Sequence, residues 1–549
     1  MPRCHVSTSP PTASSTTTQD SPEERLEQVA EVVAAANEHA DKFRSESRSA
    51  LLLPFDDPKE AFKAKSDLDL VRSLAVFSLC RIQPLVKHSE GILKWSRRLF
   101  SAPLVDAVVR ATFYRQFVAG ANGEDIKPRL KYLADNGIRA ILDYAAEDDV
   151  EADKDGSSEP NEMVVVRTYA YEGEALCDKR MGIFLKSIEA SASADGQGFA
   201  AIKVTALGVP TLLERVSVAL VAIKRLFASL DADGDGSVTE DQFVEGWRSI
   251  FHVEDDAKVR EIFRRIDSSE DGRVDYVDWS SKVSVFDMAS IAAHCRESGP
   301  FVAAVLTQEE QHLLKAMIER VDTLAKAAGA HGVRLMVDAE HSYFQPVIDA
   351  VVSHLQADHN RAAPVLYNTY QCYLKDSHER LELDLERARR GGYKFGAKLV
   401  RGAYMVLERR RASQQGAESP ILETIEETHA SYDGAVNVLL DDIARETGTE
   451  LLVASHNQRS IERCVEGMAA RGLSPSSGVY FGQLLGMADN LTFVLGRHGY
   501  GAYKYVPFGD VAEVMPYLIR RAQENSDMLG GVAKELSMMR TELWRRWLG

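Results

Sequence analysis

Hydrophobic positions along the chain follow two patterns, which change near residue 135. Between about 22 and 133, apolar residues recur at three- and four-residue steps, as in DLVRSLAVFSLCRI and PLVDAVVRATFYRQFV. This spacing is that of an amphipathic helix. Gly120 and the pair Asn122 and Gly123 interrupt the second run, because these residue types favour turns. The pattern predicts an N-terminal helical region packed on a larger body.

Beyond residue 135, short apolar runs of β-type composition alternate with longer amphipathic segments. The runs cover 138–144, 200–207, 333–340, 363–370, 395–402, 450–457, 477–483 and 502–509. Short buried runs that are each followed by helical sequence are typical of parallel α/β folds. Eight such units favour closure into a barrel over an open sheet. The predicted fold class is α/β: a TIM-like (β/α)₈ barrel with an N-terminal helical region and an inserted all-α EF-hand pair, whose loops are described below.

Polar residues gather at the carboxyl ends of the predicted strands. In such barrels the active site is built at these ends. One polar residue there marks only a strand that meets solvent, but seven in register favour a common site. They are Lys203, Asp338, Gln371, Arg401, His456, Gln483 and Tyr505.

The patterns divide the chain into six segments. Residues 1–21 are rich in Ser, Thr and Pro and are expected to be a disordered tail or targeting remnant, followed by the helical region over 22–135. The barrel occupies 136–210 and 301–525, on either side of an insertion over 211–300. Residues 526–549 form a helical tail. Its mixture of Met, Leu, Trp and Arg fits packing against the barrel or a second subunit, and also fits contact with a bilayer surface.

The insertion contains two loops with EF-hand spacing. About 125 residues separate the second and third strands, far more than an ordinary connection. The loops are DADGDGSVTEDQ (231–242) and DSSEDGRVDYVD (267–278), with helical sequence around them, and Val238 is expected to face Val274. Clustered oxygens suit a hard cation such as Ca²⁺. The candidate ligand positions are Asp231, Asp233, Asp235, Ser237 and Gln242 in the first loop, and Asp267, Ser269, Asp271, Arg273, Asp275 and Asp278 in the second.

Both loops depart from the motif at its twelfth position, where a bidentate Glu is usual. Gln242 carries no charge, and Asp278 is one methylene short of reaching two coordination sites. The sequence therefore predicts weak Ca²⁺ binding, with Mg²⁺ tolerated in the second loop. The alternative is a pair that keeps its fold and has lost regulatory binding.

Composition excludes several classes of function. The net charge of −17 and the lack of a basic stripe argue against nucleic-acid binding. Six scattered cysteines without a CxxC pair fit a reducing compartment. No stretch approaches the ~20 apolar residues of a membrane-spanning helix, so membrane contact would be peripheral. With one arginine, the first twenty residues give a weak mitochondrial targeting signal.

After the last strand, a predicted helix carries Tyr517, the adjacent pair Arg520 and Arg521, and Glu524. Adjacent helical residues diverge by about 100°, so the arginines do not form a clamp on the helix flank. Over a barrel mouth they can still converge on one carboxylate. The alternative is a solvated helix with an Arg520–Glu524 pair.

This helix, with the Y-x-P-x-G segment before it, resembles the substrate-binding helix of proline dehydrogenases. Five further motifs match that family in the same order, and the resemblance covers roughly 60–210 and 300–525. They are LMVDAE (335–340), NTYQCYLKD (368–376), KLVRGAY (398–404), ASHN (454–457) and GQLLGM (482–487).

The resemblance implies roles for individual residues. The substrate positions are Lys203, Arg520 and Arg521 for the proline carboxylate, Asp338 for orienting that cluster, Tyr404, Leu484 and Tyr505 around the ring, and Tyr517 behind the arginine helix. The flavin positions are Gln371, Lys398 (where some members have Arg) and Arg401, with His456 and Asn457 toward the adenosine end.

The resemblance also implies an activity: FAD-dependent oxidation of L-proline to Δ1-pyrroline-5-carboxylate, the first step of proline catabolism. Electrons would pass to a membrane quinone from a peripheral position on the matrix side of the mitochondrial inner membrane. Tyr505 favours proline, because relatives that prefer hydroxyproline tend to have a smaller residue there. The alternatives are a hydroxyproline dehydrogenase and a calcium-responsive binding protein with an inactive barrel. Calcium modulation and oligomeric state stay open.

Overall fold

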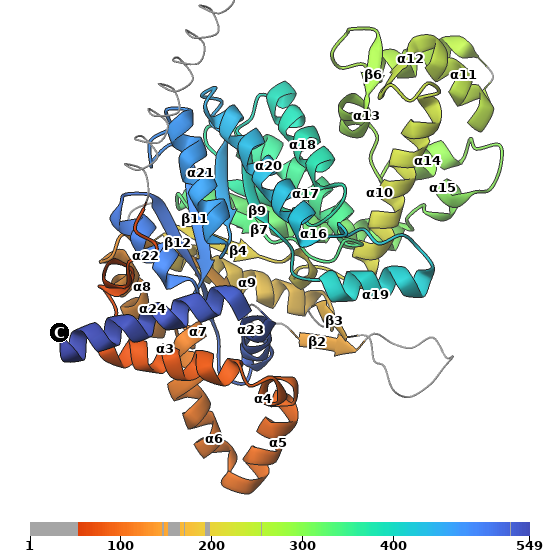
Figure 1. The fold of residues 1–549 in the computed structure, drawn as a ribbon. Helices are drawn as coiled ribbons and strands as arrows, with labels where there is room; N and C mark the ends of the chain where they lie inside the picture. Colours follow the sequence, from red (N-terminus) through yellow and green to blue (C-terminus); the bar gives the residue numbers. More distant parts are fainter. Residues whose placement is uncertain are drawn as a thin grey trace, which may run out of the picture. The chain divides into compact units, whose positions relative to one another are not determined.

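The computed structural model describes residues 53–144, 148–151, 165–168, 171–192, 198–253, 255–527 and 529–549. The segment 1–21, predicted to be disordered or a targeting remnant, lies outside the described residues, as do 22–52 of the predicted helical region. Figure 1 shows a barrel of parallel strands surrounded by helices, with the N-terminal helices (orange) beside the last two helices (dark blue) and an inserted group of elements (yellow-green).

All eight predicted strands are present, and they close into one parallel barrel. Neighbours in sequence are neighbours in the barrel, and β1 closes it by pairing with the last strand, as in Ile138 opposite Ala502. The strands are β1 (Ile138–Tyr144), β4 (Phe199–Ile202), β7 (Arg334–Val337), β8 (Leu366–Gln371), β9 (Gly396–Val400), β10 (Glu450–Ala454), β11 (Val479–Leu484) and β12 (Gly501–Phe508). The (β/α)₈ prediction is confirmed.

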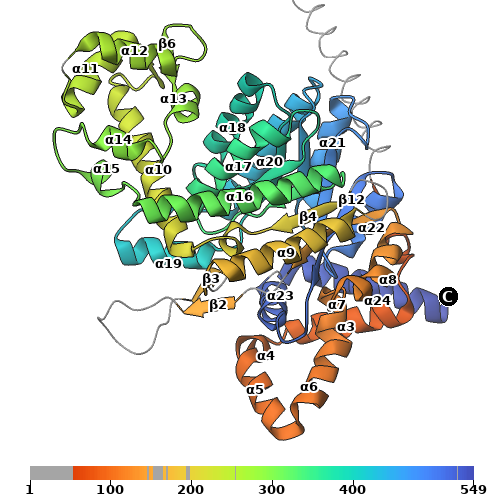
Figure 2. The same cartoon turned by 180° about the vertical axis from the view of Figure 1, so that it is seen from behind.

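Amphipathic helices cover the outside of the barrel. Two of them, α9 and α16, lie side by side (Figure 2). The outer helices are α9 (Glu174–Ser191), α16 (Gln308–Ala330), α17 (Gln345–His359), α18 (Ser377–Gly391), α19 (Met405–Gln415), α20 (Ile425–Ile443), α21 (Gln458–Ala470) and α22 (Asp489–Arg497). None of the helices within the described ranges is long and apolar enough to cross a membrane.

The N-terminal and C-terminal helices pack on each other. The tail helix α24 contacts α2 and α3, and Arg546 donates to the carbonyl oxygens of Lys65 (2.7 Å) and Phe62 (2.8 Å). Of the two predicted roles for the tail, packing against its own chain is therefore realised. The helices are α2 (Pro58–Phe62), α3 (Asp67–Cys80), α4 (Gln83–Lys87), α5 (Ser89–Phe100), α6 (Ala102–Val109), α7 (Arg115–Phe117), α8 (Gly123–Ala134), α23 (Met515–Asp527) and α24 (Leu529–Leu548).

The inserted group lies between the second and third barrel strands, as predicted. Its two loops are joined by a short antiparallel ladder in which Val238 faces Val274. Thr239 begins the next helix with a capping box formed with Gln242. The elements are α10 (Pro210–Leu230), β5 (Ser237–Thr239), α11 (Glu240–Ile250), α12 (Asp256–Ile266), β6 (Arg273–Asp275), α13 (Tyr276–Lys282), α14 (Met288–Ala292) and α15 (Pro300–Ala303).

Aromatic side chains fill the barrel toward the N-terminal ends of its strands. The Phe199 ring lies 4.7 Å from that of Tyr503 and 5.5 Å from that of Tyr367, between centroids. Arg334 and Glu450 close this end with an ion pair of 2.5 Å. The interior here is a packed core, so the polar residues that could bind a ligand lie at the opposite, C-terminal ends.

Two local features differ from the expected elements. The run over 200–207 leaves the sheet after Ile202, and Val204–Ala206 form a 3₁₀ turn. The Thr205 N–H donates to Glu340 at 3.1 Å, so a contact between distant residues ends the strand. A hairpin of β2 (Asp148–Glu151) and β3 (Val165–Thr168) follows β1 and was not predicted.

Candidate active site

An aspartate lies at the centre of the polar groups at the barrel mouth. Asp338 follows β7, and its carboxylate accepts hydrogen bonds from Lys398 Nζ (2.6 Å), Tyr505 Oη (2.8 Å) and Lys203 Nζ (3.3 Å). Lys203 follows β4, while Lys398 and Tyr505 come from β9 and β12. Three of these residues, Lys203, Asp338 and Tyr505, were predicted from their places at strand ends, and Lys398 was predicted as a flavin position from the family resemblance.

Two ammonium groups surround one buried carboxylate in this cluster. Burial alone would raise the pKa of Asp338, but the charges of Lys398 and Lys203 lower it by more. The net pKa therefore lies below the ordinary range, and the carboxylate is ionised at neutral pH. Lys398 also lies 5.2 Å from the centre of the Tyr505 ring. Lys203 and Lys398 thus place two ammonium groups at the barrel mouth, where they can attract an anionic ligand.

His456 is held as a neutral imidazole after β10. Its Nε2 accepts the Leu484 N–H at 3.0 Å, which puts the proton of the neutral ring on Nδ1. Burial lowers the pKa of His456 to about 3, with contributions from Lys504 and Arg521. The imidazole therefore positions the end of β11, where Leu484 lies, and carries no charge at neutral pH.

Two predicted flavin positions have their side chains bonded to the protein. The Arg401 guanidinium donates to His429 Nδ1 (3.0 Å) and to the hydroxyls of Ser455 and Ser460 (both 2.8 Å). The Asn457 side chain accepts the Ser460 N–H at 3.1 Å and caps α21. Both residues order the loop after β10, so a role toward flavin would act through that loop.

Helix α23, which carries the two adjacent arginines, is not the solvated surface helix that the sequence left as an alternative. Arg520 is buried, with 7% exposure, whereas a surface helix would expose it. Glu524 pairs with Arg521, three residues away, and not with Arg520 as the solvated alternative supposed. Arg521 also lies 5.0 Å from the ring centre of the buried Tyr517. Because Arg521 lowers the pKa of His456, the helix lies within electrostatic reach of the barrel mouth.

Sequence reasoning missed residues that support the cluster. The Tyr404 ring lies 4.3 Å from the ring of buried His341, whose Nδ1 is 3.5 Å from Glu408. Gln371, a predicted flavin position, donates to the Glu340 carbonyl oxygen at 2.8 Å. Glu340 is the last residue of the LMVDAE segment, two positions after Asp338, and His341 comes next, so the motif and its neighbour were the available signal.

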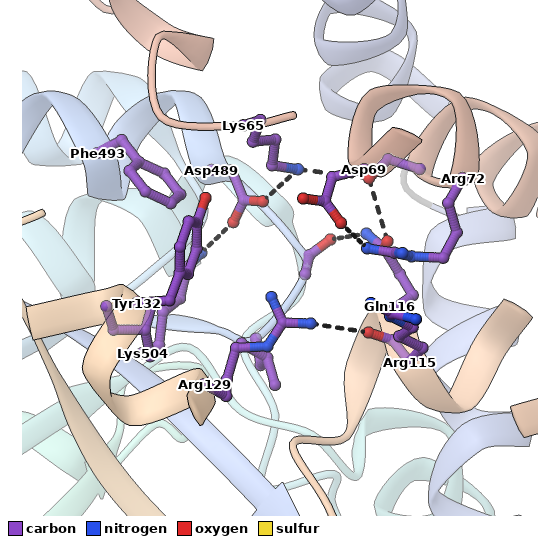
Figure 3. Close-up of a pocket in the computed structure, with 14 residues that line it drawn as sticks. Lys65, Asp69, Arg72, Arg115, Gln116, Arg129, Tyr132, Asp489, Phe493 and Lys504 are labelled. Atoms are coloured by element: carbon purple, nitrogen blue, oxygen red, sulfur yellow. Dashed lines mark hydrogen bonds and ion pairs between the residues drawn. The ribbon is translucent and has the colours of Figure 1, made fainter. Parts of the chain in front are cut away.

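A second buried charge network lies on the outer side of β12. Lys504 points away from the barrel interior, because successive strand residues alternate, and its Nζ lies 2.7 Å from Asp489. Asp489 also pairs with Lys65 at 2.6 Å, beside a cavity of about 30 Å³ (Figure 3). Lys504 donates to the carbonyl oxygens of Met487 (2.6 Å) and Leu484 (3.2 Å). This network therefore fixes the turn that carries Leu484.

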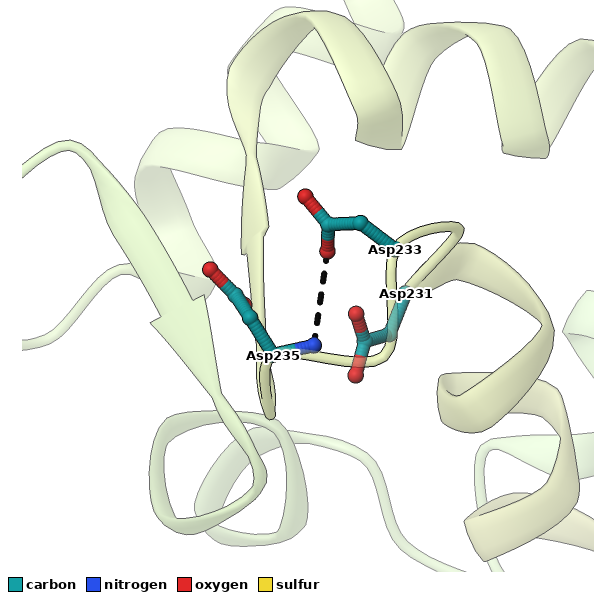
Figure 4. A group of neighbouring side chains, drawn as sticks. All are labelled: Asp231, Asp233 and Asp235. Atoms are coloured by element: carbon teal, nitrogen blue, oxygen red, sulfur yellow. Dashed lines mark hydrogen bonds between the residues drawn. The ribbon is translucent and has the colours of Figure 1, made fainter.

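In the insertion, the first loop brings three carboxylates together. One oxygen each from Asp231, Asp233 and Asp235 lies within 4.8 Å of the others, and Figure 4 shows the three side chains around the loop. Gln242 turns toward them, and its Nε2 donates to Asp233 at 3.0 Å. The geometry could hold a small cation.

The second loop is bonded to protein cations. Arg390 of α18 pairs with Asp275 at 2.5 Å and lies 3.5 Å from Asp278. Arg273 reaches across to the first loop, where it donates to Ser237 at 2.7 Å and pairs with Asp235. Asp267 accepts the Gly272 N–H at 3.0 Å, and Ser269 donates to Asp267 at 3.2 Å.

Known proteins resemble this chain in sequence and in fold. The proline dehydrogenase family profile matches residues 184–534. The chain is 36% identical over 542 residues to proline dehydrogenase 1, mitochondrial, of Homo sapiens, which covers 90% of this chain and 89% of that protein. The enzyme of the same name from Caenorhabditis elegans is 36% identical over 554 residues, covering 91% of this chain and 89% of that protein. Hydroxyproline dehydrogenase of Xenopus laevis is 34% identical over 487 residues, covering 88% of each.

Among solved structures, proline utilization A (PutA) from Bdellovibrio bacteriovorus superposes with a TM-score of 0.53. The match covers 88% of this chain and 40% of that longer protein, at 16% identity, and therefore supports the fold. The family profile and the relatives, which match over most of their length, decide the question of membership. This chain belongs to the proline dehydrogenase family.

Proposed function

We propose that this chain is an FAD-dependent proline dehydrogenase that oxidises L-proline to Δ1-pyrroline-5-carboxylate. The observation that carries the proposal is the Asp338 cluster, in which Lys203, Lys398 and Tyr505 converge at the barrel mouth of a member of this family. The ammonium groups of Lys203 and Lys398 can attract the carboxylate of proline, which is the one anionic group of this small substrate.

The residues at the barrel mouth fit a flavin. An isoalloxazine ring and a pyrophosphate need hydrogen-bond donors and positive charge, which Lys398, Gln371 and the ordered loop after β10 supply. FAD, when bound, supplies the redox chemistry by accepting a hydride equivalent from the ring carbon, whose C–H bond breaks as the C–N bond becomes C=N and the nitrogen loses a proton. The neutral His456 keeps this loop in place without adding charge.

The chain's own residues would bind and orient the substrate. Arg520, Arg521 and Lys203 are proposed to hold the carboxylate, and Tyr404, Leu484 and Tyr505 to enclose the ring and exclude water. Fixing the carboxylate at one end would orient the ring and limit its motion at the barrel mouth. We assign no residue as general base.

Tyr505 bears on the choice between proline and hydroxyproline. Its hydroxyl is fixed on Asp338, so the phenol ring cannot easily turn away to make room for a ring hydroxyl. Hydroxyproline dehydrogenases are among the relatives, at 34% identity for that of Xenopus laevis, and they make this activity the second candidate. The position of Tyr505 supports proline.

The test is the visible spectrum of the purified protein before and after anaerobic addition of proline. Flavin bands that bleach with proline, and much less with hydroxyproline, are the expected result. Bleaching by hydroxyproline alone would select the second candidate. A protein that takes up no FAD would instead support the binding-protein alternative with an inactive barrel.

For the cellular setting, we propose peripheral association with the matrix side of the mitochondrial inner membrane and a membrane quinone as acceptor. The support is the family membership and the mitochondrial proline dehydrogenases among the relatives. Oligomeric assembly is compatible with this setting.

We further propose that the insertion is an EF-hand pair in which the first loop binds Ca²⁺ weakly. The support is the Asp231, Asp233 and Asp235 cluster, together with the Val238–Val274 ladder between the loops. Gln242 lowers the charge of this site. The second loop was predicted to tolerate Mg²⁺. Because Arg390 already forms ion pairs with Asp275 and Asp278, we expect weaker metal binding in this loop.

Titration calorimetry on the full chain checks this. Ca²⁺ is expected to bind with a Kd of about 10⁻⁴ M or weaker, and D231N to weaken binding by roughly tenfold or more. E245Q, which removes an exposed charge on α11 outside the loop, should leave binding unchanged. Equal binding by D231N and the wild type would contradict the site. Proline oxidation that is the same in Ca²⁺ and in chelator would exclude modulation while leaving binding intact.

A further inference from the structure

The hairpin formed by α5 and α6 exposes its apolar side chains. Among the described residues of these helices, none is buried. Six large hydrophobic side chains are exposed, out of nineteen in the described part of the chain. They are Ile92 (38%), Trp95 (63%), Leu99 (56%), Phe100 (55%), Leu104 (56%) and Val108 (57%).

These side chains recur at helical spacing. Ile92, Trp95 and Leu99 follow steps of three and four along α5, and Leu104 and Val108 are four apart on α6. Such stripes are usually the buried faces of amphipathic helices. Figures 1 and 2 both show the hairpin projecting away from the barrel, so no neighbouring element of the described chain covers it.

The hairpin is basic, whereas the chain as a whole is acidic. Residues 87–110 contain five Lys or Arg and two Asp or Glu, against a net charge of −17 for the whole chain. Asp106, the acidic residue of α6, is paired with Arg97 at 2.6 Å, which links the two helices. Lys94 and Arg98 are exposed on α5 beside the apolar stripe. This local charge complements an anionic surface.

We infer that the α5–α6 hairpin inserts its apolar face into the interface of an anionic lipid bilayer. This inference rests on the proposed function, because it gives that enzyme's membrane contact a definite surface. Amphipathic helices with Lys and Arg beside Trp, Phe and Leu bind such interfaces through buried apolar area and attraction to anionic headgroups. Trp95 has the amphipathic ring that favours the headgroup level.

The position of the hairpin agrees with delivery of electrons to the bilayer. The helix before it, α4, packs against α23, which carries Arg520 and Arg521. A bilayer at the hairpin would therefore lie on the same side of the molecule as the substrate helix. A lipid-soluble acceptor could reach the barrel mouth from there. The exposed Trp544 and Trp547 of α24 form the competing surface.

The test is co-sedimentation of the full-length protein with vesicles, measured without proline. We expect binding to phosphatidylcholine vesicles that contain phosphatidylglycerol, weak binding to pure phosphatidylcholine, and a decrease with salt. W95E/L99E should reduce the partition coefficient by about tenfold or more, because two apolar anchors are lost. V218E on α10 is the matched control, since Val218 is exposed to 58% and Leu99 to 56%. K94E/R98E should remove the preference for the anionic lipid.

Three outcomes would overturn the inference: no binding by the wild type, unchanged binding by W95E/L99E, or loss of binding in W544E with the hairpin variants unaffected. A wild-type dimer that W95E/L99E dissociates, without vesicle binding, would identify the face as an interface between two copies.

The control for folding is proline-dependent reduction of a soluble dye, which should be unchanged in W95E/L99E. Vesicle binding by a protein that proline does not reduce would refute the proposed function and leave this surface standing.

Discussion

D338N is expected to lower kcat/KM for proline by about a hundredfold or more. In the wild type, Lys203 and Lys398 both donate to the buried Asp338 carboxylate. In the variant, the two ammonium groups would face each other around a neutral amide. Losing the carboxylate that holds both ammonium groups would misplace these substrate-binding groups, and a displacement of about 1 Å can cost roughly a hundredfold in rate. Steady-state kinetics with proline and a soluble acceptor measure the effect.

D322N is the control for this variant, because Asp322 forms an ion pair with Lys326 on the outer helix α16, away from the mouth. It should have nearly wild-type kinetics. Flavin content is measured for both proteins. If D338N kept its flavin and lost less than about threefold in kcat/KM, the cluster would be structural only.

The same variant has a defined pH dependence of stability. The folded-state pKa of Asp338 lies below its unfolded value of about 3.9, so its ionised form stabilises the fold above that pH. The contribution is lost as the pH falls below about 4 toward the folded pKa. Denaturant unfolding should therefore show D338N less stable than the wild type at neutral pH, with the difference narrowing in acid. A constant difference down to pH 3 would contradict the low pKa.

R520M/R521M is expected to raise KM for proline by about a hundredfold or more while leaving flavin content close to that of the wild type. Charge-assisted hydrogen bonds from an arginine fork to a carboxylate are among the strongest polar contacts, and truncating them costs several kcal/mol. R521K tests the geometry separately, since lysine keeps the charge and loses the fork. KM and bound flavin are measured together.

R540M serves as the control, because Arg540 is an exposed arginine on the adjacent helix α24. It should leave KM unchanged. R520M/R521M could instead lose most of its flavin, while the fraction that still holds flavin has the wild-type KM for proline. In that case α23 would belong to the cofactor site. That result would remove the assignment of the arginine pair to the substrate carboxylate.

Local pattern was enough for the main elements of the fold. A strand that is buried on both faces needs a continuous apolar run, and all eight runs form strands of the closed barrel. The position of the insertion was also predicted, because about 125 residues between two strands exceed an ordinary connection. Element boundaries were less accessible. Thr205 leaves the sheet because its N–H bonds to Glu340, which is 135 residues away.

The candidate site shows the same division. Strand ends and family motifs predicted the residues that meet at Asp338, because parallel strands bring their carboxyl ends to one mouth. The buried network of Lys504, Asp489 and Lys65 was missed, since nothing in the local sequence identifies partners that meet only after folding. The sequence left the partner of Glu524 open for the same reason: Arg520 is buried, and Arg521 forms the ion pair.

The sequence by itself determined the barrel, the insertion between its second and third strands, and the family, because periodicity, turn chemistry and ordered motifs are local properties. Only the tertiary structure decided which apolar faces are covered. On α24, Leu536, Met539 and Leu543 follow the same steps of three and four as the apolar residues of α5. They are buried where α24 packs on α2 and α3, whereas the stripe of α5 is exposed. Spacing fixes which side chains share a face, and burial depends on whether another part of the chain arrives to cover that face.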